Sequence, residues 1–147
     1  YTFWKRQSPP PNMRVFDAPT RETCTVQRSR TNTPLQALAL MNDPTFVEAS
    51  RKLAELIMTL DSSELSQQVV FAFRRATARR PSSAEVDVLL DVFQVQKRHF
   101  TDDETEALKL LSVGGSRRNN ELNVAEHAAW TTVASMILCL DETISRR

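Results

Sequence analysis

Four polar residues near the first predicted helix start are the strongest candidates for binding chemistry in this sequence. The stretch RETCTVQRSRTNT, residues 21–33, contains Arg21, Arg28, Arg30 and Asn32. The planar guanidinium group matches a carboxylate, sulfate or phosphate, and a helix N-terminus adds backbone donors for an anion. The four residues are therefore candidates to contact an anionic ligand or a partner. The alternative is that Arg28 and Arg30 hold the N-terminal segment on the fold through carbonyl and carboxylate contacts.

The cysteines and histidines give weaker signals. Cys24 and Cys139 could form a disulfide in an oxidising compartment, and two unpaired thiols are the alternative that we favour. His99 and His127 are isolated in the sequence, whereas a metal site needs three or four converging donors. We therefore predict no metal site and expect both histidines to be structural or surface residues.

Motifs of several enzyme classes are missing from the sequence. There is no CxxCH for covalent haem attachment, no CxxC or HExxH for zinc, no glycine-rich phosphate loop and no GxSxG. A second basic cluster, Arg74, Arg75, Arg79 and Arg80, is typical of a solvated helix end. No catalytic residue and no cofactor can be assigned, and whether the chain is an enzyme stays open.

Composition narrows the classes of partner. The 147 residues include 19 Lys and Arg against 18 Asp and Glu, so the net charge of +1 does not favour nucleic-acid binding. No apolar run approaches the length of about 18 residues that a membrane span needs. Only two glycines occur, adjacent at Gly114 and Gly115, which favours helices over hairpin-rich β folds.

Helix-start signals recur along the sequence from Thr33 onward. Thr33-Pro34-Leu35-Gln36 is a capping box with proline at the first helical position. The Asn42-Asp43-Pro44 interruption is a structural joint, because Asp43 can cap the next helix. The first two predicted helices span about 34–41 and about 44–60. The next three begin at capping segments 61–64, 82–85 and 101–104 and end at about 77, 100 and 111. The last begins at the capping segment 123–126.

Apolar residues at helical spacing predict which faces are buried. On the second helix the buried stripe starts at Phe46, and Arg51 belongs to the solvent face. On the fifth helix Leu108 is expected to face inward, and on the last helix Trp130 does so. The segment 112–122 is expected to be a polar, mobile loop.

These patterns predict an all-α fold, a bundle of about five to six helices with an extended, proline-rich N-terminal arm. The arm, residues 1–32, packs on the bundle, residues 33–147, which forms a single domain. The arm carries six basic and two acidic residues, the main local charge excess. The aromatic start YTFWKR, without an initiator methionine, indicates a fragment of a longer protein.

Three stretches carry a family resemblance. Residues 1–55, YTFWKRQSPPPNMRVFDAPTRETCTVQRSRTNTPLQALALMNDPTFVEASRKLAE, resemble the C-terminal region of the planctomycete family called domain of unknown function 1553. AFRRATARRPSSAE and AAWTTVASMILCLDETISRR resemble later parts of that family. The resemblance implies large exported proteins, periplasmic or at the cell surface, that often carry a cytochrome-c-like domain. It implies no catalytic residue, because the activity of that family is not established.

Two functions from different classes follow as expectations. The first is a non-catalytic helical interaction module that docks on upstream domains of the same polypeptide. The second is one lobe of an enzyme completed by upstream residues, acting on anionic polysaccharide or in redox-linked work, with the arginine cluster as an anion site. Nucleic-acid binding by the basic arm is the weakest expectation.

Overall fold

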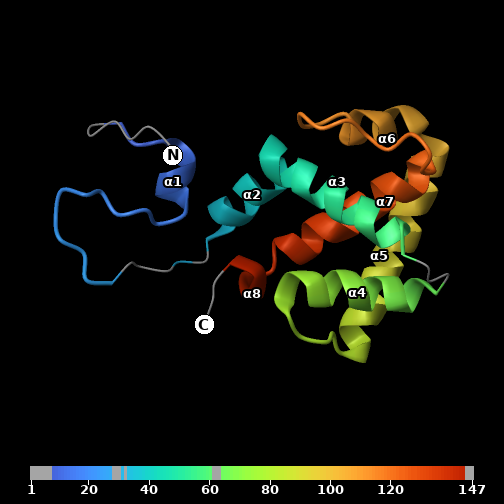
Figure 1. Cartoon of the computed structure of the whole chain (residues 1–147), viewed down its shortest axis with the longest axis horizontal. Helices are drawn as coiled ribbons and strands as arrows, with labels where there is room; N and C mark the ends of the chain where they lie inside the picture. Colours follow the sequence, from blue (N-terminus) through green and yellow to red (C-terminus); the bar gives the residue numbers. More distant parts are fainter. Residues whose placement is uncertain (1–7, 28–30, 32, 61–63, 145–147) are drawn as a thin grey trace.

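The computed structural model describes the chain except residues 1–7, 28–30, 32, 61–63 and 145–147 (Figure 1). Within the described residues there are eight α-helices and no strand, so the all-α prediction is confirmed. The helices are α1 (Pro11–Val15), α2 (Pro34–Asn42), α3 (Pro44–Met58), α4 (Leu65–Thr77), α5 (Ser83–Asp102), α6 (Glu104–Leu111), α7 (Val124–Leu138) and α8 (Asp141–Ile144). None of these helices is long and apolar enough to cross a membrane.

Helix α7 forms the centre of the bundle. It packs against α2, α3, α4, α5, α6 and α8. Its apolar residues are spread around all sides of the helix, which is typical of a core helix, and its buried alanines let neighbouring helices approach closely. Trp130, predicted to face inward, is 2% exposed and lies 4.4 Å from Phe93 of α5, measured between ring centroids.

Side-chain hydrogen bonds confirm most of the predicted helix starts. Thr33 and Ser82 form complete capping boxes with Gln36 and Glu85. Three further starts have a capping side chain, contributed by Asp43, Asp103 and Asn123. The predicted cap at 61–63 lies outside the described residues, and Glu64 makes no side-chain cap bond at the start of α4.

The Asn42-Asp43-Pro44 joint is structural, as predicted. Asp43 ends α2 and begins α3, and its Oδ1 accepts a hydrogen bond of 2.8 Å from the Thr45 amide. This backbone hydrogen bond is the main cause that lowers the pKa of the Asp43 carboxyl. The joint turns the chain sharply between α2 and α3 (Figure 1).

Three predictions about buried faces were wrong. Arg51, assigned to the solvent face, is 0% exposed, because its guanidinium group donates to Ser116 in the 112–122 loop. Phe46 is 36% exposed, because it lies on the first turn of α3 and faces the arm. Leu108 is 45% exposed, because α6 turns Ala107 and Leu111 inward instead.

The arm, expected to be extended, contains one short helix that the sequence patterns did not predict. Residues 11–15 form the single-turn helix α1, which Pro11 can begin because the first helical position needs no N–H partner. Helix α1 packs against α2, at the end of the molecule away from α4 and α5 (Figure 1). The 112–122 loop, expected to be mobile, is hydrogen-bonded to α3 through Gly115, Ser116 and Arg117.

Candidate functional site

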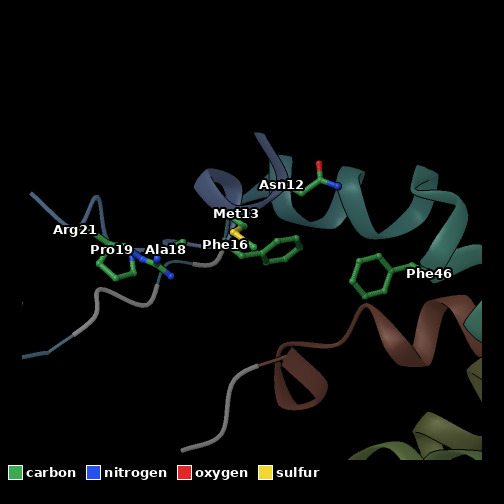
Figure 2. Close-up of a pocket in the computed structure, with 7 residues that line it drawn as sticks. All are labelled: Asn12, Met13, Phe16, Ala18, Pro19, Arg21 and Phe46. Carbon is green, nitrogen blue, oxygen red and sulfur yellow. The ribbon is translucent and has the colours of Figure 1, made fainter. Parts of the chain in front are cut away.

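A largely apolar cleft of about 500 Å³ lies between the arm and the start of α3. The cleft is lined by Asn12, Met13, Phe16, Ala18, Pro19, Arg21 and Phe46 (Figure 2). Phe16 and Phe46 face each other with ring centroids 6.4 Å apart. A cleft with mostly apolar walls and few polar groups favours binding of an apolar segment or ligand.

Polar contacts attach the arm to α2 and to the α2–α3 joint. Asn12 Nδ2 donates to Asp43 Oδ2 at 2.9 Å, and the largely buried Gln36 donates through Nε2 to the Val15 carbonyl at 2.8 Å. Within the arm itself, Asp17 Oδ2 accepts hydrogen bonds from the amide and hydroxyl of Thr31 at 2.8 and 2.7 Å. Sequence patterns did not predict these contacts, because nothing local in the sequence pairs residues 14 to 31 positions apart.

The structure places one of the four candidate contact residues at this cleft. Arg21 lines it and has a left-handed backbone, with φ of 64°. Arg28, Arg30 and Asn32 lie outside the described residues. Whether the four side chains gather around an anion, or whether Arg28 and Arg30 hold the arm, therefore remains a prediction.

The outer surface of α2 exposes three large apolar side chains. Leu35, Leu38 and Met41 are 58%, 57% and 55% exposed, and α2 buries only Gln36 and Leu40. We call these three residues the α2 apolar surface. An isolated exposed leucine is ordinary, but three large apolar side chains exposed on one short helix favour an interaction surface.

The cysteines and histidines lie apart from the cleft lining. Cys24 and Cys139 are both free thiols, and burial raises the pKa of Cys139. His99 is exposed and bonds Glu106 at 2.9 Å, whereas His127 is fully buried on α7. Among the described residues, no three His, Cys, Asp or Glu side chains are grouped so that they could hold a metal ion.

The second basic cluster is partly structural. Arg79 pairs with Glu85 at 2.7 Å and with Glu142 at 2.6 Å, and its guanidinium lies 4.7 Å from the Phe73 ring centroid. Hydrogen bonds from Arg79, followed by those from Ser82, lower the pKa of Glu85 to about 2. Arg79 thus joins the start of α5 to α8.

Comparison with family models gives a match over the N-terminal part of the chain. A family model described as PSD1, protein of unknown function (DUF1553), matches residues 1–93. The match includes the arm, the cleft and α2 through α4. No curated protein and no solved structure matches the chain.

Proposed function

We propose that this chain, which belongs to the PSD1 family of proteins of unknown function (DUF1553), is a non-catalytic helical docking module. In this proposal it binds upstream domains of its own polypeptide through the α2 apolar surface and the cleft. Its placement in exported planctomycete proteins rests only on the sequence resemblance and is part of the proposal.

The exposure of α2 is the observation that carries the proposal. Leu35, Leu38 and Met41 leave more than half of their surfaces in solvent, although the helix is apolar on nearly every face. Burying a fully exposed side chain of this size contributes roughly 1.5–3 kcal/mol, so covering the exposed half of one of these contributes about half of that. A partner that covers all three therefore gains a substantial part of a binding free energy.

The charge of the arm indicates the chemistry of the partner. The first 32 residues contain six basic and two acidic residues, and Arg21, one of the basic residues, lines the cleft. An upstream helix with an apolar face and acidic flanking residues is complementary to this surface.

Binding in trans tests the proposal. The 147-residue chain and the upstream region are produced separately, and their affinity is measured by isothermal titration calorimetry. We expect association that the double variant Leu35→Glu/Leu38→Glu weakens about tenfold or more, since covering the exposed halves of the two leucines together contributes about 1.4 kcal/mol or more.

The matched control is Val88→Glu/Val95→Glu. These valines are 56% and 59% exposed on α5, away from α2, so their replacement should leave the affinity unchanged. Thermal melts confirm that both variants remain folded. Absence of association, or equal weakening by both double variants, would contradict the docking proposal.

A second candidate function is one lobe of an enzyme with an anion site. The observation in its favour is that Arg21 lines the cleft. The test is turnover of an anionic substrate by a protein in which the upstream region and this chain are joined. If Arg21→Gln raises its KM more than it lowers its kcat, the enzyme function replaces the docking function.

A further inference from the structure

The 112–122 loop is attached to α3 by a dense set of hydrogen bonds. Glu48 accepts from the amides of Gly115 and Ser116 at 2.7 and 2.9 Å. Arg51 Nη2 donates to the carbonyl and hydroxyl of Ser116 at 2.9 and 2.8 Å, and Lys52 donates to the Arg117 carbonyl at 3.2 Å. The loop therefore covers a polar region between α3 and α7.

Three buried polar atoms in this region have no hydrogen-bond partner among the described residues. They are Arg51 Nε, Arg118 Nη1 and His127 Nδ1. A buried polar atom left unpaired costs about 1–3 kcal/mol, so such atoms are rare and call for an explanation. Three of them around one loop indicate a group that all three can bind.

The three atoms lie in one electrostatic neighbourhood. The charged groups that act on His127 are Glu55 and Arg51 from α3 and Arg118 from the loop. Burial is the main cause that lowers the pKa of His127, and both guanidinium groups lower it further. Glu126, one residue earlier on α7, is already paired with Lys97 of α5.

The charges of this region leave an excess of positive charge. Arg51, which is fully buried, reaches Glu55 only at 3.5 Å, and Lys52 reaches the same carboxylate at 2.7 Å. Glu48 also attracts Arg51, but its carboxylate accepts the amides of Gly115 and Ser116, so three cations, Arg51, Lys52 and Arg118, stand against two carboxylates. Arg118 makes no ion pair within the described residues. A buried guanidinium group without a full counter-charge is costly, so an anion would stabilise this arrangement.

Arg118 also gives the region an opening. It lines a polar cleft of about 750 Å³ formed by the end of α5, the start of α6, the loop and the first turn of α7. Arg118 therefore combines a buried Nη1 with a place in the wall of a solvent-accessible cleft. The charged residues that share this wall are Lys97, Glu104, Glu121 and Glu126.

We propose that Arg51, Arg118 and His127 form a binding site for a small oxyanion of the sulfate, phosphate or carboxylate class. Arg51 Nε and Arg118 Nη1 donate to the oxyanion. His127 Nε2 lies 3.3 Å from the Arg51 carbonyl, which can only accept, so this nitrogen carries its proton. His127 Nδ1 donates as well once a second proton is bound, so oxyanion binding is accompanied by proton uptake.

Imidazole NMR of the intact chain tests the site, because the sequence contains only two histidines. Sodium sulfate is titrated against sodium chloride at equal ionic strength, and sodium phosphate and acetate are titrated in separate arms. We expect a saturable shift of the His127 ¹⁵N signals with sulfate, and none for the exposed His99. The sulfate affinity should rise from pH 8 to pH 6, where sulfate itself does not titrate.

Paired variants separate the site from general anion effects. Arg118→Gln should weaken sulfate binding about tenfold, the loss expected for one charge-assisted hydrogen bond, and Arg118→Lys should restore part of it. Arg117→Gln removes the same charge from the preceding, exposed residue and should change the affinity less than about twofold.

Three outcomes would overturn the inference. One is a His127 signal that does not respond to any of the three oxyanions, as expected if only a buried water pairs these atoms. Another is a response that His99 shares. The third is equal weakening by Arg117→Gln and Arg118→Gln.

Discussion

At the scale of single residues, Gly114 shows how a distant contact fixes the residue type in a loop. Its φ is 104°, and a Cβ built at this position would lie 2.4 Å from Glu48 Oε2 and 2.7 Å from Glu48 Cβ. Glu48 cannot move away freely, because its carboxylate accepts the amides of Gly115 and Ser116. Hydrogen bonds from the Ser116 side chain and from these amides lower the pKa of Glu48 to about 2.

We therefore expect Gly114→Ala to lower the free energy of unfolding by about 1–3 kcal/mol, the usual cost of forcing a side chain into this backbone region. Gly115→Ala is the matched control, because a Cβ there meets nothing within 4 Å. Its effect should stay within roughly 0.5 kcal/mol. Urea denaturation of the two variants measures the difference, and equal midpoints would show that Gly114 is not constrained.

At the scale of elements, the start of α5 combines a helix cap with an ion pair. Glu85 accepts the Ser82 amide at 2.7 Å, completing the capping box, and also binds Arg79, which lies beyond the end of α4. The pKa of Glu85 is about 2, against an ordinary value of 4.5. Above pH 4.5 the carboxylate is ionised in both the folded and the unfolded chain, and its stabilising effect is fully present.

As the pH falls from 4.5 to about 2, the unfolded chain takes up the proton first, so the stabilisation is progressively lost. We expect the urea midpoint of the wild type to fall across this pH range. Glu85→Gln keeps the capping hydrogen bond but not the charge, so its urea midpoint should depend less on pH. Asp91→Asn on the same helix is the control, because Asp91 is exposed and makes no hydrogen bond or ion pair within the described residues. Parallel pH profiles for Glu85→Gln and the wild type would contradict this assignment.

The elements also show which parts of the structure the sequence could predict. The caps at Thr33, Asp43 and Ser82 bond amides only two or three residues away, so local sequence was sufficient to place these helix starts. The buried Arg51 binds Ser116, which lies 65 residues later, and helical periodicity carries no information about such a contact. Of the four candidate anion-binding residues, only Arg21 lies among the described residues, where it lines the cleft. The proposed site of Arg51, Arg118 and His127 was not predicted, because its members are far apart in the sequence.

At the scale of the whole molecule, the hydrophobic core and the proposed docking surface occupy different regions. Among the described residues, the buried apolar cluster extends from Leu53 on α3 to Ile137 on α7. Helix α1 buries no residue, and the arm is attached mainly by polar contacts to α2 and the α2–α3 joint. This separation lets a partner bind α2 without disturbing the core.

The same separation predicts that the chain lacking residues 1–32 still folds. We expect its helices α3 to α7 to unfold cooperatively in urea, because the core loses no buried side chain. Helix α2 should fray, since Gln36 and Asp43 lose their partners in the arm.

The matched control, residues 1–115, lacks an equal length at the other end, including α7, which every larger helix of the bundle contacts. Far-ultraviolet circular dichroism should show a sharp transition for 33–147 and a gradual loss of signal for 1–115. A gradual loss for 33–147 as well would mean that the arm is an integral part of the folding unit.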